Sequence, residues 1–355
     1  MALLRTQTDP STFVAYTHAA AGHDGVRSDP SGSIIVKPCT PAEVAFYESA
    51  ATHPKFQAYM PTFMGTLVLS ENQDPCSPTA PATAAPAVIS NDLQKGGAAD
   101  WVPSGGKKLD TGLSIVLENV TAGFKRPNVI DVKLGARLWD DDAPETKKRK
   151  LDDVSDATTS RSLGFRIVGM RVYRPERRKK IEGISEKHIA VQEDGYLSYD
   201  KYYGRNFGAE NVHEAFVEFL GGEETLKKPG RTQHVAKRLA REVRDLAAVL
   251  QEEESRMYSA SILMVYEGDE AAMEAAMQDE KRRAAIVASD SSGKIGEDEV
   301  SEEEEDEQLP KVSEMRLIDF AHARWTPSQG PDENVLHGLR SLLKILEQLT
   351  MEEKG

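Results

Sequence analysis

The segment Pro127–Gly135, with the sequence PNVIDVKLG, places an acid and an amine two residues apart among apolar neighbours. In an extended strand this spacing puts the side chains of Asp131 and Lys133 on one face. A lysine can hold a phosphate as a point charge, and an aspartate can bind ribose hydroxyls or a metal ion. A structural ion pair at a strand end would have the same spacing, so the spacing alone leaves both interpretations open.

Two further sites carry groups that nucleotide chemistry uses. Asp319 ends the apolar run MRLID, and His322 follows three residues later. Phosphoryl transfer requires an acid that holds Mg²⁺ across the nucleotide phosphates, although an aspartate here can also cap a helix. Lys37 ends the apolar run SIIVK, where a kinase carries a phosphate-facing lysine. Neither GxxxxGK(S/T) nor GxGxxG occurs, so the phosphates would have to be held in another way.

Two basic runs could bind anions. Residues 147–150 (KKRK) lie between the acidic groups at 140–142 and 152–153, and a second run covers residues 174–180. A solvated loop, a nuclear-import patch and a site for a small polyanion such as a sugar phosphate all fit the first run.

The composition limits the classes of protein that fit. A chain of 355 residues is predicted to form about two folding units, or two lobes of one enzyme. The net charge of −14 argues against general nucleic-acid binding but leaves room for local basic sites. Two cysteines, Cys39 and Cys76, without a CxxC pair favour a reducing, intracellular compartment over a disulfide framework or a zinc ribbon. We expect neither a signal peptide nor a transmembrane segment, because the apolar runs are too short.

Apolar periodicity predicts mostly strands early in the chain and helices late. Strands are expected at 33–38, 112–120, 259–266 and 315–320, and helices at 41–49, 211–221, 235–250 and 335–349. Their composition predicts that residues 71–107 and 268–310, the latter with the acidic tract 301–307, are disordered inserts. An α+β protein with two lobes fits this order of elements.

Taken together, these segments resemble the inositol polyphosphate kinase family. PNVIDVKLG is similar to the PxxxDxKxG signature of that family, and the family's other segments follow in the family's order. They are GHDG (22–25), SIIVKP (33–38), EVAFYE (43–48), SLGFRIVGMRVY (162–173), SASILMVYEG (259–268), LIDFAHARW (317–325) and GPDENVLHGLRSLLKIL (330–346). The resemblance spans nearly the whole ordered chain and is strongest to the multikinase branch, particularly its fungal members.

The resemblance implies a two-lobe fold related to ATP-grasp enzymes and protein kinases. A strand-rich, ATP-binding lobe would cover residues 1–120, and an α+β lobe would cover 121–355 with a small helical, inositol-binding insertion at about 136–162. The implied activity is ATP- and Mg²⁺-dependent phosphorylation of inositol 1,4,5-trisphosphate and a tetrakisphosphate towards a pentakisphosphate.

The family's nucleotide-binding roles carry over to four residues. Lys37 would contact the ATP phosphates, and the backbone of Glu118 and Val120 would hold adenine at the hinge between the lobes. Asp131 would bind the ribose hydroxyls.

The family's catalytic roles carry over to Lys133 and Asp319. Lys133 would stand between nucleotide and inositol and stabilise the transferred phosphoryl group, and Asp319 would hold Mg²⁺. Positioning and electrostatic stabilisation would supply most of the catalysis, and no residue is singled out as the general base. The expected contacts to the acceptor are Lys147, Lys150, Arg171, Lys201 and His322.

Other functions stay open at this point. Within the family, a hexakisphosphate kinase or a kinase of phosphoinositide lipids would carry the same motifs. A transcription-associated scaffold that binds protein partners through the acidic insert is the alternative outside enzymes, although such a protein would be expected to have lost Lys133 or Asp319. We expect a monomer in the nucleus and cytoplasm, because the basic runs would serve nuclear import.

Overall fold

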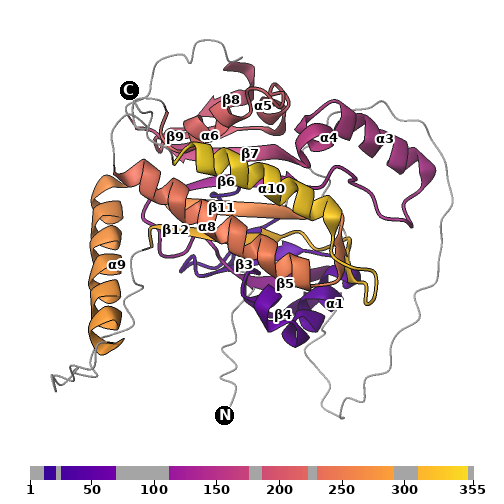
Figure 1. Ribbon diagram of the computed structural model, residues 1–355, viewed down its shortest axis with the longest axis horizontal. Coiled ribbons are helices and arrows are strands. Elements are labelled where there is room, and N and C mark those ends of the chain that lie inside the picture. The colour runs from indigo at the N-terminus through magenta and orange to yellow at the C-terminus, as the bar shows by residue number, and fades with distance from the viewer. Residues whose placement is uncertain are drawn as a thin grey trace.

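Two antiparallel sheets form the framework of the protein (Figure 1). The computed structural model describes residues 12–20, 25–68, 112–175, 186–222, 230–291 and 311–350. One sheet comes from the N-terminal part of the chain and the larger sheet from the rest, which confirms the predicted α+β architecture in two lobes. Most of the GHDG segment, the insert at 71–107, the acidic tract and residues 176–180 lie outside the described residues.

The N-terminal sheet has five strands in the order β1-β2-β3-β5-β4, with short helices beside it. Helix α1 begins after Thr40, whose side chain accepts a hydrogen bond from the N–H of Glu43, and Pro41 has the fixed φ that suits the first helical position. The elements of this lobe are β1 (Val14–Ala15), β2 (Arg27–Ser28), β3 (Ile34–Pro38), α1 (Pro41–Ser49), η2 (Ala50–Thr52), α2 (Pro54–Gln57), β4 (Phe63–Val68) and β5 (Leu113–Glu118).

The C-terminal sheet has six strands in the order β12-β11-β6-β7-β9-β8, and a separate pair joins β10 to β13. Its strands are β6 (Pro127–Leu134), β7 (Phe165–Tyr173), β8 (Ile189–Val191), β9 (Tyr196–Tyr199), β11 (Ser261–Glu267) and β12 (Ser313–Ile318), and the separate pair is β10 (Ser255–Met257) and β13 (Ala323–Trp325). Its helices are α3 (Glu145–Asp156), α4 (Thr159–Leu163), η3 (Glu186–His188), α5 (Lys201–Gly204), α6 (His213–Phe219), α8 (Arg231–Glu252), α9 (Glu270–Ser291) and α10 (Glu333–Gln348).

Strand β6 separates the core of the protein from its cleft. Its alternate residues Ile130, Val132 and Leu134 are buried in the main hydrophobic core. Because successive side chains of a strand point to opposite faces, Asp131 and Lys133 lie on the other face. The signature segment therefore anchors the core with one set of side chains and presents charged groups with the other.

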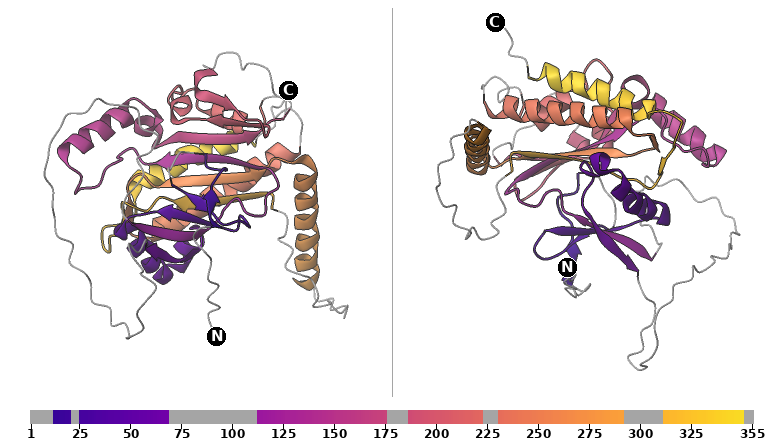
Figure 2. Two further views of the ribbon diagram at one scale, coloured as in Figure 1. Left: turned by 180° about the vertical axis from the view of Figure 1, so that it is seen from behind. Right: turned by 60° about the horizontal axis from the view of Figure 1, so that its bottom comes forward.

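Helices α8 and α10 cover the core face of the C-terminal sheet. Figure 2 shows them on one side of this sheet and the N-terminal sheet on the other. The apolar stripe of α10 that includes Leu336, Leu339 and Leu342 is fully buried. Each such leucine contributes about 1.5–3 kcal/mol to folding through removal from water, so this layer fixes the position of the strands that carry the cleft residues.

Aromatic rings join helix α1 of the N-terminal lobe to the C-terminal lobe. The ring of Phe46 is stacked on Trp325 and on Phe320, with centroid distances of 4.9 and 5.0 Å. The Trp325 indole also donates a hydrogen bond to the Ser49 hydroxyl over 2.8 Å. These contacts hold α1 in a fixed position relative to the strand end that carries Asp319.

The prediction of a disordered insert at 268–310 is wrong for its first half. Residues 270–291 form helix α9, and Met273 and Ala276 pack against the core. The charges of this segment predicted disorder, whereas its alanines and methionines favour a helix. Among the described residues, no helix is long and apolar enough to cross a membrane.

Candidate active site

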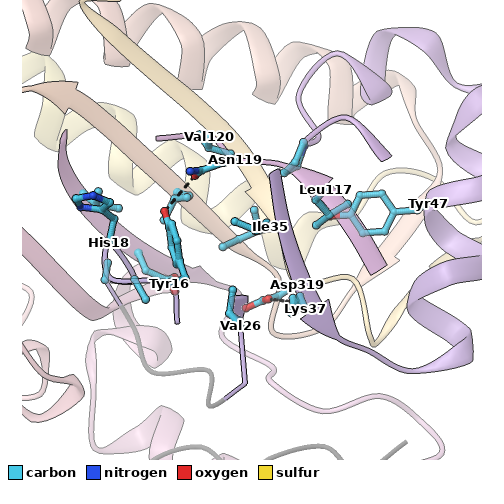
Figure 3. Close-up of a pocket in the computed structure, with 17 residues that line it drawn as sticks. Tyr16, His18, Val26, Ile35, Lys37, Tyr47, Leu117, Asn119, Val120 and Asp319 are labelled. Atoms are coloured by element: carbon cyan, nitrogen blue, oxygen red, sulfur yellow. Dashed lines mark hydrogen bonds and ion pairs between the residues drawn. The ribbon is translucent and has the colours of Figure 1, made fainter. Parts of the chain in front are cut away.

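A cleft lies between the two sheets, with largely apolar walls and charged groups at one end (Figure 3). It encloses about 700 Å³, part of which is open to solvent. Ile35 and Leu117 line it from the N-terminal sheet, and Val129 and Leu263 line it from the C-terminal sheet. A slot with apolar walls and a few convergent charges suits a ligand with a flat ring and an anionic tail.

Lys37 stands at the charged end, between two carboxylates. Its Nζ lies 2.6 Å from Asp319 Oδ1 and 2.9 Å from Glu43 Oε1. Burial by itself disfavours the charged form, but the two carboxylates outweigh burial and raise the pKa of Lys37 above its ordinary value. Lys37 is therefore a permanent cation that joins strand β3, helix α1 and the end of strand β12.

Asp319 and Lys133 complete this end of the cleft. Asp319 follows strand β12 with a φ of +68°, a left-handed conformation that turns the chain sharply. Lys133 Nζ lies 3.9 Å from Asp319 Oδ2 and donates a hydrogen bond to the carbonyl of Ser259 over 2.7 Å. Burial lowers the pKa of Lys133, and the carboxylates of Asp319 and Asp131 only partly offset this effect.

The charged end has the chemistry that a magnesium–nucleotide complex requires. Mg²⁺ is usually held by one or two carboxylates together with phosphate oxygens and water. The described residues contain no group of three or more His, Cys, Asp or Glu side chains that could hold a metal ion. Asp319 can supply the single carboxylate that Mg²⁺ needs when phosphate oxygens and water are its other ligands. Lys37 and Lys133, which lie beside Asp319, supply positive charge for the phosphates.

The other end of the cleft has a hydrogen-bonded rim that follows strand β5. The Tyr16 hydroxyl contacts Asn119 Oδ1 at 3.2 Å and Thr121 Oγ1 at 3.0 Å. Val120 lines the cleft, as expected for a residue that holds a base. The Glu118 carboxylate instead accepts hydrogen bonds from Thr62, so this residue could contribute only backbone groups, as predicted.

The prediction that Arg171 contacts the acceptor is wrong in this structure. Its side chain is 2% exposed, and its guanidinium donates to Asp194 Oδ2 over 2.6 Å and to His18 Nδ1 over 2.7 Å. It also lies 3.6 Å above the Tyr196 ring. Because His18 lines the cleft on the rim side, Arg171 supports the rim and has no free surface for a phosphate.

The remaining predicted acceptor contacts lie on the C-terminal lobe. Lys147 and Lys150 are exposed on α3, and Lys201 begins α5, where its Nζ lies 5.4 Å from the ring centroid of Tyr202. His322 Nδ1 lies 2.5 Å from Asp140 Oδ2 in the loop before α3. Whether these cations contact an acceptor stays a prediction.

Two charged residues at this site were not predicted from the sequence. Glu43 is 1% exposed and pairs with Lys37, and its position three residues into the predicted helix 41–49 was the available signal. Arg166 lies opposite Lys133 in the register of strands β6 and β7. Burial and the nearby guanidinium of Arg205 lower the pKa of Arg166 to about 10. The two guanidiniums repel each other, so this side of Lys133 has a local positive charge.

Comparisons with known proteins agree with this arrangement. The family model described as inositol polyphosphate kinase matches residues 114–347. The inositol polyphosphate multikinase of Saccharomyces cerevisiae is 32% identical, covering 92% of this chain and 96% of that protein. Inositol hexakisphosphate kinase 1 of Mus musculus is 30% identical, but covers 68% of this chain and 52% of that protein. The crystal structure of the multikinase Ipk2 from S. cerevisiae, in complex with ADP and Mn²⁺, matches with a TM-score of 0.62 and 27% identity over 90% of this chain and all of that one.

Proposed function

Because the chain belongs to the inositol polyphosphate kinase family, we propose that it is an ATP-dependent inositol polyphosphate multikinase. Its acceptors would be inositol 1,4,5-trisphosphate and the resulting tetrakisphosphate, and its final product a pentakisphosphate. The observation that carries the proposal is the cluster of Lys37, Lys133 and Asp319 at the charged end of the interlobe cleft. A scaffold without catalytic activity would have no need for two half-buried lysines around one carboxylate.

Coverage of the relatives favours the multikinase over the hexakisphosphate kinases. The alignment with the S. cerevisiae multikinase covers 96% of that protein, and the alignment with the Schizosaccharomyces pombe multikinase covers 97% of that protein at 26% identity. The alignment with the mouse hexakisphosphate kinase covers only 52% of that protein. The match therefore extends over nearly the whole of the two multikinases and over only about half of the hexakisphosphate kinase.

The geometry suggests how the nucleotide would bind. The base would occupy the apolar slot near Val120, and Asp131 would meet the ribose hydroxyls. The phosphates would extend towards Lys37. The Ipk2 crystal structure is a complex with ADP and Mn²⁺, which supports a metal–nucleotide complex in this cleft. Bound to Asp319, the metal ion would neutralise charge on the phosphates.

On the acceptor side, the site would rely on position and charge. Lys133 lies between the nucleotide end and Arg166, so its ammonium would stabilise the phosphoryl group in transit. Arg166 and Arg205 would bind acceptor phosphates. An inositol hydroxyl would attack the γ-phosphorus as the bond to the ADP oxygen breaks, with the two oxygens in line.

Incubation with ATP, Mg²⁺ and inositol 1,4,5-trisphosphate, with products separated by phosphate number, tests this proposal. We expect stepwise formation of tetrakis- and pentakisphosphate. Lys133→Met, which keeps the length of the side chain and removes its charge, should lower turnover at least about 10³-fold. Lys55→Ala is the matched control, because Lys55 is 67% exposed in a surface ion pair and its loss should leave turnover unchanged.

Other acceptors would identify an alternative function. Turnover of inositol hexakisphosphate or of a phosphoinositide lipid, without turnover of the trisphosphate, would contradict the multikinase proposal but keep the kinase. Failure to bind ATP at all would contradict both and favour the scaffold.

A further inference from the structure

An aspartate and a histidine form a close pair beside the charged end of the cleft. Asp140 Oδ2 lies 2.5 Å from His322 Nδ1. The aspartate side chain is 15% exposed and the histidine side chain 40% exposed. The carboxylate is therefore held inside the protein, and the imidazole is open to an arriving molecule.

Two chain segments bring this pair to the site. His322 follows Asp319 after a sharp turn, and its carbonyl accepts a hydrogen bond from the N–H of Tyr258 over 3.1 Å. The next residue, Ser259, offers its carbonyl to Lys133 and its hydroxyl to the carbonyl of Leu138, two residues before Asp140. The segment Tyr258–Ser259 therefore contacts both the chain around the Asp140–His322 pair and the ammonium of Lys133.

The pair also lies beside the loop that leads to helix α3, where acceptor contacts are predicted. Asp140 belongs to the loop between strand β6 and helix α3, the helix that carries Lys147 and Lys150. Neither Asp140 nor His322 lines the apolar slot in which the base would bind. An acceptor held between α3 and Lys133 would therefore have its attacking hydroxyl near this imidazole.

The contact with Asp140 determines which nitrogen of His322 can act. A carboxylate at Nδ1 favours the tautomer with its proton on Nδ1, which leaves the lone pair on Nε2. Within the described part of the chain, Nε2 has no hydrogen-bond partner. A carboxylate beside Nδ1 and an open Nε2 are the two features that an aspartate–histidine pair needs for Nε2 to accept a proton.

We propose that His322 is the general base of the reaction and that Asp140 is its positioning residue. The proposal rests on the proposed kinase function. As the acceptor oxygen forms its bond to the γ-phosphorus, its proton moves to Nε2, and the electron pair of the breaking P–O bond stays on the ADP oxygen. The Asp140 carboxylate stabilises the resulting imidazolium, which then releases the proton to solvent through its exposed side.

The other charged residues near this turn have partners of their own, so they are not available to orient or replace the imidazole of His322. Asp141, the next residue, is bound instead by two guanidiniums, those of Arg137 and Arg324. Lys133 and Asp319 are engaged with each other and with the phosphate end of the cleft. Of the charged groups around this turn, Asp140 is the one that contacts the imidazole.

Three variants of the full-length protein test the proposal. His322→Gln keeps a polar side chain but cannot carry the proton, and we expect kcat to fall by about 10²–10³-fold with both KM values within about threefold of wild type. Asp140→Asn should lower kcat by about 10-fold or more. Asp141→Asn is the matched control, because it removes the adjacent acid without touching the imidazole, and it should retain wild-type kcat.

The split between kcat and KM separates a proton acceptor and its positioning residue from a structural contact. Both KM values of Asp140→Asn should stay within about threefold of wild type while its kcat falls, because the carboxylate acts on the proton transfer and not on substrate binding. A rise in KM with kcat unchanged would instead indicate a binding contact and overturn the role of Asp140.

The outcomes distinguish this proposal from the one on which it rests. Wild-type kcat in His322→Gln, or the same kcat in Asp140→Asn and Asp141→Asn, would overturn the general base and leave the kinase standing. Absence of turnover on any inositol phosphate by the wild-type protein would refute the kinase function, and the general base with it.

Discussion

Replacement of Asp319 by asparagine tests the reasoning about the charged end of the cleft. Asp319 has a φ of +68°, and asparagine is one of the few residues that tolerates this conformation, so Asp319→Asn removes the charge and keeps the turn. At an effective dielectric constant of about 20, a carboxylate 2.6 Å from one ammonium and 3.9 Å from another attracts them by about 6 and about 4 kcal/mol before desolvation is counted. The substitution thus removes the main counter-charge of both lysines.

Nucleotide binding should respond in opposite directions with and without the metal ion. Without Mg²⁺, Asp319 repels the ATP phosphates and occupies Lys37, so Asp319→Asn should bind ATP about 10-fold more tightly than wild type. With Mg²⁺, the variant has lost the carboxylate that would hold the ion, and it should gain little from Mg²⁺. We expect turnover to fall at least about 10³-fold.

Calorimetric titration of ATP in Mg²⁺ and in EDTA, beside a turnover assay, measures these effects. Asp319→Ala is the control for the backbone, because a Cβ without a polar group costs about 1–2 kcal/mol in the left-handed region. It should lose activity like Asp319→Asn and also melt roughly 2–4 °C lower. If Asp319→Asn kept the wild-type dependence of ATP affinity on Mg²⁺, the assignment of Asp319 to the metal would be refuted.

Three further predictions concern packing, pH and the corrected arginine. In Gly164→Ala, a Cβ would lie 2.5 Å from the His337 ring at a φ of +68°, so we expect a loss of about 2–5 kcal/mol in the free energy of unfolding measured with urea. Gly32→Ala, at a similar φ in open space, should lose only about 1 kcal/mol, and equal losses would refute the steric argument. Burial raises the pKa of the Glu242 carboxyl to about 7, so the folded state binds the proton more tightly and stability falls as pH rises from about 4.5 to about 7. Glu242→Gln should therefore melt higher than wild type at about pH 8 and show no such gain at about pH 4.5, and a lower melting temperature at the higher pH would contradict this interpretation. Arg171→Lys keeps the charge but loses the fork to His18, so KM for ATP should rise severalfold with KM for the acceptor unchanged, and the reverse pattern would return Arg171 to the acceptor site.

Local spacing was enough to predict several parts of the site. Asp131 and Lys133 lie on one face of β6 because a strand alternates its side chains, whatever the strand packs against. The final helix follows from leucines at intervals of three and four, and its buried stripe matches that pattern. Asp319 was recognised because an acid closed an apolar run.

Contacts between residues that are distant in sequence could not be predicted from local spacing. Arg171 was assigned to the acceptor from its motif, and residues distant in sequence decided otherwise. His18 lies 153 residues earlier in the chain, and Asp194 comes from a turn 23 residues later. No local pattern predicts that both meet the same guanidinium. Arg166 was missed for the same reason, since its importance comes from its register opposite Lys133 and its closeness to Arg205.

The sequence by itself determined several of the main elements and their order, the family and the residue types of the phosphate end. Backbone periodicity and short-range sterics act within a few residues, so a short stretch of sequence is enough to determine these features. The tertiary structure alone decided which charges meet. Lys37, Glu43 and Asp319 form one cluster only because α1 is stacked on the aromatic rings of the C-terminal lobe. Electrostatic interactions depend on distance in space, and folding alone sets that distance.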